Sequence, residues 1–407
     1  MKVLKLSVAL CLVYSSLVIA NENNSTLDSY ISDLKQQEFG YDYEKNDAES
    51  SKLRDSWIAP IQLQYSYSKS KPYVDELTNQ NAAIKMDQPI FQSGGIYYGI
   101  KFANASKKYS DYSIDVAKRK MIKETISLLM QIKQTTLKEE AQKLQIQNSE
   151  INLAQKKEQY LSGQLDSGFL DNAVIQRNIV IQALYDIQTA KERLITQFET
   201  LSDLDYQTAR IPHLEYISSE EFIKHNIVLK QNSAEVEKSD YYHSVTIAKY
   251  LPKVSLTAGY NWSNSEQQFS QNVGFKNDLS YYDYGIRASM PLDINMFSDI
   301  ESVKVDYLKS KIVQEDKRRE LKALFEQVLH NIDNFDKKIA LSNENIDIYS
   351  RLLADTKDLF TAGYKTQQDV DTLENSLNIQ NFDSKVYEID KQLSLLNLYE
   401  MCVNEGE

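Results

Sequence analysis

Few side chains in this sequence have the types and spacing that catalysis or metal binding requires. His213, His225, His243 and His330 lie far apart, without the short spacing of metal-ligand pairs. Cys402 would be the one cysteine left after removal of an N-terminal signal, so no intrachain disulfide or CxxC motif can form. A Gly-rich phosphate-binding loop and a GxSxG motif are also missing. We therefore expect no enzyme, no cofactor and no metal.

Charge and hydropathy narrow the class of protein further. The formal net charge of −12 disfavours nucleic acid as a partner, because phosphates require a basic surface. Residues 1–20 have the pattern of a signal peptide: Lys2 and Lys5 precede an apolar stretch at 6–19, and Ala20 suits a cleavage position. A buried N-terminal helix is the alternative. No run of 18 apolar residues follows, which argues against a helical membrane protein.

Two similar stretches, "QYLSGQLDSGFL" and "LFTAGYKTQQDV", indicate an internal repeat. Gly163 and Gly363 are 200 positions apart, and each follows an aromatic residue three positions earlier, Tyr160 or Phe360. The prolines of "QPIF" and "MPLD" recur at an offset of 202. Similarity at a fixed offset means that the chain uses one structural unit twice.

Long helices are predicted before and after both glycines. Residues 94–162 and 296–362 are rich in Lys, Glu, Gln, Leu and Ile and contain few helix breakers. The second stretch has a heptad seam with alternating spacings of 4 and 3, as in a coiled coil: Leu321, Phe325, Val328, Ile332, Phe335, Ile339, Ser342, Ile346, Tyr349 and Leu353. Such a rod would extend about 100 Å. Partner helices follow at about 170–205 and 367–400, so each glycine would close the tip of a helical hairpin.

Between the helical stretches, apolar and polar residues alternate, which predicts strands at about 58–68, 82–91, 252–264 and 279–292. A soluble sandwich would show the same alternation. The strand lengths suit a tilted membrane β-barrel better, and a polar, charged second face suits a water-filled lumen. The apolar face also carries an aromatic girdle, predicted to face lipid: Tyr65, Tyr67, Tyr260, Trp262, Tyr282 and Tyr284.

Each repeat supplies two strands, and four strands cannot close a barrel. An open sheet edge is not tolerated in lipid, and the smallest barrels use about eight strands. Several copies of the chain must therefore share one barrel. The predicted fold is mainly α with a β-barrel part, built from two repeats, 21–210 and 211–407, each with a strand pair and long coiled-coil helices.

This order of elements resembles the TolC-like outer membrane factor family. The motifs that carry the resemblance are "DQPIFQSGGI" (87–96), "YLPKVSLTAGYNW" (250–262) and "AGYKTQQDV" (362–370). The resemblance implies a homotrimer in the outer membrane of a Gram-negative bacterium, with a 12-stranded barrel and a periplasmic α-helical tunnel. It also implies docking by a periplasmic adaptor (membrane fusion) protein and an inner-membrane transporter. The trimer would then be the passive exit duct of a tripartite efflux pump or type I secretion system.

The resemblance also assigns roles near the second tip. In members of the family, acidic side chains at two positions narrow the periplasmic aperture. Asp369 falls at the first of these positions. The second position holds a threonine in this sequence, and Asp371 and Glu374 lie nearby. Lys365 and Phe360 match the basic and aromatic residues that hold the tip closed in some members. Three copies of one carboxylate converging on a symmetry axis would favour cations. Alternatively, these acids only stabilise a helix N-terminus.

The hairpin tips would also dock the adaptor, although each tip residue could equally serve only in a helix-capping turn. The docking set is Tyr160, Gly163, Leu165, Gly363, Thr366 and Val370.

The competing function is a secreted coiled-coil adaptor that bridges the periplasm without conducting, but the Gly- and Val-rich domains usual in adaptors are missing. Finally, "ENNST" fits a bacterial N-glycosylation pattern at Asn24, with a polar disordered terminus as the alternative.

Overall fold

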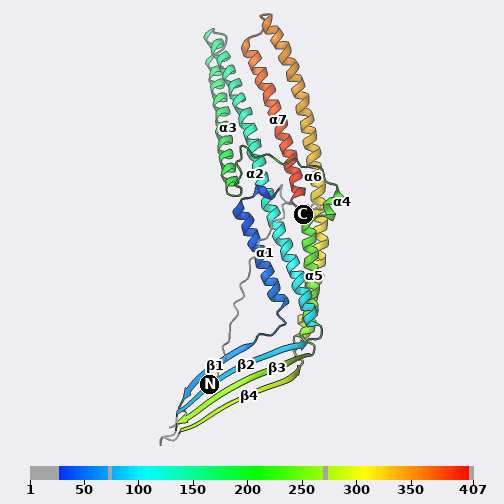
Figure 1. Ribbon diagram of the computed structural model, residues 1–407. Coiled ribbons are helices and arrows are strands. Elements are labelled where there is room, and N and C mark those ends of the chain that lie inside the picture. The colour runs from blue at the N-terminus through cyan, green and yellow to red at the C-terminus, as the bar shows by residue number, and fades with distance from the viewer. Residues whose placement is uncertain (1–26, 72–75, 269–273, 403–407) are drawn as a thin grey trace.

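The computed structural model describes residues 27–71, 76–268 and 274–402 and has an elongated shape (Figure 1). A four-stranded sheet forms one end, and two helical hairpins extend from it to the opposite end. The predicted signal peptide and the Asn24 sequon lie outside the described residues. Within the described ranges, no helix is both long and apolar enough to cross a membrane.

Two rods run the length of the helical part. α2 (Gly95–Leu161) has 67 residues and α6 (Met296–Thr361) has 66, which at about 1.5 Å per residue gives roughly 100 Å each. α3 (Ser167–Glu199) and α7 (Gln367–Tyr399) return along the half of each rod that is remote from the sheet (Figure 1). The first return helix, predicted at about 170–205, begins three residues and ends six residues earlier than predicted.

Two shorter helices cover the sheet-side half of the rods. α1 (Asp33–Arg54) packs on α2, and α5 (Ile227–Lys249) packs on both α2 and α6. The sequence patterns predicted no helix at 227–249. Because α5 contacts two rods, its buried residues are spread around the helix and form no single apolar stripe.

The heptad seam predicted for α6 lies against the rest of the protein. Leu321, Phe325, Val328 and Leu353 are buried, as is the polar member Ser342, and the other five members are half-buried. Burying each large apolar side chain contributes about 1.5–3 kcal/mol to stability. The coiled-coil interpretation is confirmed.

Midway along the rods, the short segments η1 (Asp28–Tyr30) and α4 (Ser219–Lys224) pack against the long helices (Figure 1). This middle region is called the waist below. One buried cluster there combines residues from both repeats: Ile31, Phe39, Ile122, Ile126, Met130, Leu214, Leu395 and Leu396. A second cluster surrounds α4: Phe222, Leu229, Leu321, Phe325, Val328, Leu398 and Cys402. The waist therefore holds the two repeats together.

The strands form one antiparallel sheet in the order β1-β2-β3-β4. Their bounds are Gln62–Ser70, Glu76–Phe91, Lys253–Gln268 and Gly274–Ser289. β2 pairs with β3, so the strand pairs of the two repeats lie side by side. Within the described chain, β1 and β4 each have one edge without a partner strand.

The predicted strand boundaries were wrong in two ways. β2 begins at Glu76, β3 extends to Gln268 and β4 begins at Gly274, so all three continue beyond the alternating pattern. Their outer rows are polar, and backbone pairing there leaves no hydrophobic signal. β1 begins after Pro60 and β4 ends before Pro291, since proline has no N–H to donate to the ladder.

Candidate functional site

The two hairpin tips have the same backbone geometry. Gly163 has φ of 73° and Gly363 has φ of 80°, in the left-handed region that favours glycine. The amide of Gly163 donates to the carbonyl of Tyr160 at 3.0 Å, and that of Gly363 to Phe360 at 2.9 Å. The next amide along donates five residues back in both tips, at 2.9 and 2.8 Å. Both tips are therefore Schellman turns, which explains the repeated glycine.

The helices that follow the tips start with different caps. The Asp166 carboxylate accepts from the amide of Gly168 at 2.8 Å. At the second tip, the Thr366 hydroxyl accepts from the Asp369 amide, and the Asp369 carboxylate accepts from the Thr366 amide at 2.9 Å. This capping box lowers the pKa of Asp369 through the hydrogen bonds from Thr366. Asp369 is thus held ionised at the start of α7.

The tips expose apolar and aromatic side chains. Tyr160 and Phe360 are each 41% exposed, and Tyr364 is 81% exposed. Of the other predicted tip residues, Gly163, Gly363, Lys365 and Thr366 are exposed and Leu165 is half-buried. Val370 is buried, at 4% exposure, so its side chain stabilises the start of α7 instead of presenting a surface.

A groove of about 470 Å³ lies between α2 and α7 near the tips. It is lined by Gln147, Glu150, Ile151, Ala154, Gln368, Asp371, Glu374 and Asn375. The Asn375 amide donates to Asn148 at 2.9 Å and joins the two helices. The structure therefore brings Asp371 and Glu374 together with Glu150. Glu150 was not predicted from the sequence, because the 200-residue repeat matches α2 with α6 and gives no sign that α2 lies against α7.

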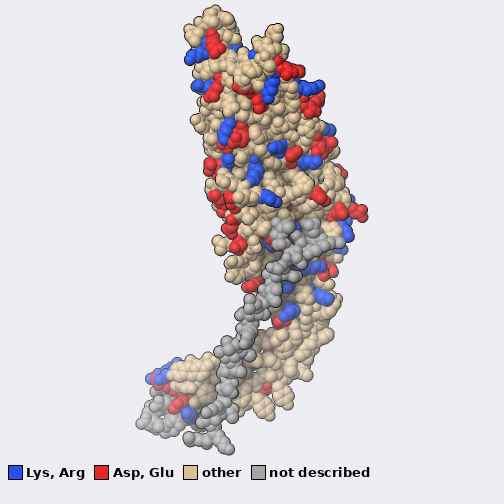
Figure 2. All heavy atoms as spheres, turned by 45° about the horizontal axis from the view of Figure 1, so that its top comes forward, with Lys and Arg blue, Asp and Glu red and all other residues tan. Residues whose placement is uncertain are grey.

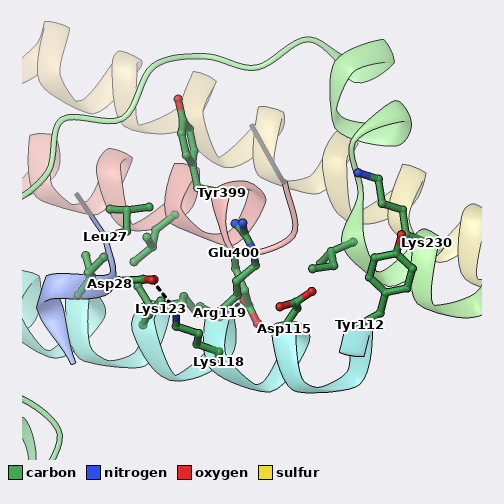
Figure 3. A pocket seen from close by; sticks show the side chains of 14 residues that line it. Leu27, Asp28, Tyr112, Asp115, Lys118, Arg119, Lys123, Lys230, Tyr399 and Glu400 are labelled. Carbon is green, nitrogen blue, oxygen red and sulfur yellow. Dashed lines mark hydrogen bonds and ion pairs between the residues drawn. The ribbon is translucent and has the colours of Figure 1, made fainter. Parts of the chain in front are cut away.

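A second pocket, of about 340 Å³, lies at the waist between η1, α2, α5 and α7 (Figure 3). Lys118 forms an ion pair with Asp28. Lys123 pairs with Glu400 at 3.1 Å, and Arg119 donates to the carbonyl of Cys402 at 2.8 Å. These contacts fasten both ends of the described chain to α2. No group of three potential metal ligands is found among the described residues.

The six predicted girdle residues lie on one face of the sheet. The register pairs Tyr260 with Tyr282 and Ala258 with Tyr284, and aligns Tyr65 with Trp262 through Ala82. Tyr67 follows two positions after Tyr65 on the same face of β1. The rings of Tyr282 and Tyr284 stack at 6.4 Å. Tyr65, Tyr282 and Tyr284 are 66%, 75% and 80% exposed, so this aromatic face is uncovered in the single chain.

The opposite face of the sheet is polar. It carries the glutamines and serines of β1, and hydrogen bonds between strands join Ser263 to Asn81 and Ser265 to Asn79, each at 2.8 Å. Figure 2 shows charged side chains scattered over the helical part and gathered at the far end of the sheet, with few on the visible stretch between. A sheet with one apolar face, one polar face and a belt with few charges is typical of a membrane barrel wall.

Residues 219–400 match the family model described as outer membrane efflux protein. No curated protein matches the chain by sequence.

Solved structures extend the similarity to the whole chain. CmeC, an outer membrane channel of Campylobacter jejuni, is 13% identical with a TM-score of 0.70 over 98% of this chain and 93% of its own. VceC of Vibrio cholerae is 13% identical with a TM-score of 0.68 over 92% and 95%. MtrE, an outer membrane channel of Neisseria gonorrhoeae, is 11% identical with a TM-score of 0.60 over 92% and 88%. The fold of this chain is the fold of these channels.

Proposed function

We propose that this chain belongs to the TolC-like outer membrane efflux protein family, because residues 219–400 match the family model and the fold matches solved channels, and that its residues build an exit duct. It is an outer membrane efflux channel that extends into the periplasm, and channels of this family form trimers. The proposal concerns the assembly of this chain, its partners and its aperture. No catalytic step is involved, because a duct only conducts what its partners deliver.

The observation that carries the proposal is the open sheet. β1 and β4 each leave an edge unpaired among the described strands, and lipid does not tolerate unpaired backbone groups. If β4 of one copy pairs with β1 of the next, the contact is head to tail and repeats until the ring closes. Three copies would give a 12-stranded barrel with the aromatic face toward lipid and the polar face toward water.

The helical part supports the same arrangement. α6 has a second apolar stripe besides the heptad seam, and this stripe is uncovered: Leu341, Ile348, Leu352 and Leu359 are 39–62% exposed. α3 exposes Ile175 and Ile179 at a spacing of four, so both lie on one helix face. We place the α6 stripe of one copy against α3 of the next, which would close the tunnel in the same direction as the barrel.

The tips suit a protein partner. Exposed Tyr160, Phe360 and Tyr364 offer aromatic anchors at the end of the molecule farthest from the sheet, and aromatic residues contribute strongly to protein interfaces. We therefore assign the tips to a periplasmic adaptor, which would couple the duct to an inner-membrane transporter in an efflux pump or type I secretion system.

The aperture would lie at the start of α7. Asp369 is held ionised there, and Asp371 and Glu374 line the neighbouring groove. Three copies of these acids around the axis would make the periplasmic entrance cation-selective. Lys365, two residues before α7, and Phe360, the last residue but one of α6, would lie beside this ring.

The first test is the native mass of the protein extracted from membranes in detergent, followed by conductance in planar bilayers. We expect a trimer in the outer membrane fraction that opens ohmic channels. A water-soluble monomer without conductance would contradict the duct and favour the non-conducting coiled-coil adaptor instead.

A further inference from the structure

Five charged residues share the polar face of the sheet near its junction with the helices. They are Lys85, Asp87, Lys253, Asp283 and Arg287. The register aligns Lys85 with Asp283 through Gly259, and aligns Arg287 with Pro89 through Ser255. Because side chains alternate along each strand, all five point away from the aromatic face. In the proposed barrel they would line the lumen where the tunnel enters it.

An ion pair fixes part of this cluster. The Arg287 guanidinium donates from Nη1 to Oδ2 of Asp87 at 2.9 Å, which joins β4 to β2 across β3. The pair can span β3 because Ser255 and Thr257, the intervening residues, are small. Asp283 is held separately, since it accepts from the side-chain amide of Asn261 at 2.6 Å.

Gly259 keeps the space between these groups open. A Cβ atom at this position would lie 2.7 Å from Oδ1 of Asp283, closer than a Cβ atom approaches other heavy atoms in proteins. A hollow of about 500 Å³ lies over this part of the sheet, lined by Thr257, Ala258 and Asn261 of β3 and by Lys85, Asp87, Asp283 and Arg287. The hollow is large enough for the polar group of a small solute.

Two cations of the cluster remain available. Within the described part of the chain, the ammonium groups of Lys85 and Lys253 form no ion pair and no hydrogen bond. The cluster holds three cations and two carboxylates, a net charge of +1, whereas the whole chain carries −12. Among these five residues positive charge is thus in excess by one, whereas acidic residues outnumber basic ones in the chain as a whole.

We infer that this cluster is a solute-recognition site: a ring of three copies at the inner mouth of the barrel that binds carboxylate or phosphate groups of departing solutes. This inference rests on the proposed duct. Converging cations in a lumen with low-dielectric walls raise the local concentration of anions. The Asp87–Arg287 pair holds the surrounding side chains in place, and Lys85 and Lys253 supply the charge that an anionic group meets.

The test compares two double variants in planar bilayers. Lys85→Gln/Lys253→Gln removes two positive charges from the polar face. Lys69→Gln/Lys276→Gln removes two from the aromatic face, at the far end of the sheet, and serves as the matched control. We expect the first variant to raise the potassium-to-chloride permeability ratio by about twofold or more, and the control to leave it unchanged. Citrate added on the tip side should reduce the conductance of the native channel and not that of the first variant.

The possible outcomes separate the two proposals. Conducting channels in which both double variants keep the native permeability ratio and the citrate block would overturn the recognition ring and leave the duct intact. An equal change of the permeability ratio in both variants would also overturn the recognition ring, because the ratio would then depend on the total charge of the sheet and not on this cluster. A trimer that never conducts would overturn the duct itself, and the ring with it.

Discussion

At the scale of single residues, Asp369 combines two tasks in one carboxylate. It closes the capping box with Thr366, and the same hydrogen bonds keep its pKa below the usual range. The capping interpretation and the aperture interpretation are therefore compatible, since a well-capped acid is also a permanently charged one. Substitution at this position affects both the fold of the tip and its charge, and two variants are needed to separate them.

We predict that Asp369→Asn and Asp369→Ala both lower cation selectivity, because each removes one charge per copy from the aperture. Only Asp369→Ala should also destabilise the tip, by about 0.5–2 kcal/mol, because asparagine keeps an oxygen that can accept from Thr366. Reversal potentials in a salt gradient and thermal unfolding followed by circular dichroism measure the two effects. Native reversal potentials in both variants would remove Asp369 from the aperture.

Replacing Gly363, the left-handed glycine of the second tip, and Gly40, a glycine inside α1, by alanine should change the stability of the protein in opposite directions. Gly363→Ala should destabilise the protein by about 1 kcal/mol, because alanine is strained at φ of 80° even though a Cβ there meets nothing within 4 Å. Gly40→Ala is the matched control: its Cβ also meets nothing within 4 Å, but the residue lies inside α1. That variant should stabilise by about 0.5–1 kcal/mol. Thermal shifts of the same sign in both variants would contradict the strain argument.

At the scale of elements, the first hairpin contains a buried ionic junction. Glu139 on α2 is 9% exposed and accepts from Lys191 on α3 at 2.8 Å. Lys143 lies 3.2 Å away, and Gln188 donates at 3.5 Å. The hydrogen bond from Lys191, with those from Lys143 and Gln188, lowers the pKa of Glu139 to about 2. This junction joins the two helices midway between the waist and the tip.

The junction makes the stability of the hairpin depend on pH. The carboxyl pKa is about 2 in the folded state and near 4.5 in the unfolded chain, so the unfolded state takes up a proton first on acidification. The stabilisation, at most about 3 kcal/mol, is complete above pH 4.5 and is lost as the pH falls toward 2. Glu139→Gln should lower stability at pH 7 and flatten this dependence.

Chemical unfolding at pH 7 and pH 3 is the measurement. The control is Glu140→Gln, which removes the exposed neighbour that pairs with Lys143 alone. We expect the control to change stability by less than about 1 kcal/mol at either pH. If both variants lose the same small amount and keep the same pH dependence, the junction does not hold the hairpin together.

Sequence reasoning predicted the elements that carry a local signal. The repeated glycines, the heptad seam of α6 and the alternation around Tyr260 all report short-range geometry, and the structure has the corresponding turns, rod and sheet. The polar outer rows of β2 to β4 and the helix at Ile227–Lys249 were missed, because backbone pairing and packing between two rods leave no periodic pattern. The capping box of Thr366 and Asp369 could have been recognised from the sequence as Thr-x-x-Asp. The position of Glu150 in the groove and the charged cluster on the polar face of the sheet could not, because both depend on contacts between segments that are distant in the sequence.

At the scale of the whole molecule, the proposed trimer predicts contact between the two free sheet edges. In a Cys402→Ser background, Gln64→Cys on β1 is combined in turn with Leu279→Cys, Tyr281→Cys or Asp283→Cys on β4, all on the polar face. Oxidation should give a ladder of covalent dimers and trimers for one of these pairs, and the ladder should stop at three. Each single cysteine variant is a control and should give no trimer. Monomers alone for all three pairs would contradict edge-to-edge closure.

The near-equal lengths of α2 and α6, 67 and 66 residues, have a consequence for how such a protein can change during evolution. Because both rods run from the sheet to a hairpin tip, their similar lengths place the two tips at about the same distance from the sheet. Inserting one heptad into a single rod would move its tip by about 10 Å relative to the other. Lengthening can succeed only when both rods and both return helices change by whole heptads together. Insertions and deletions in relatives should therefore occur in matched sets, 200 positions apart.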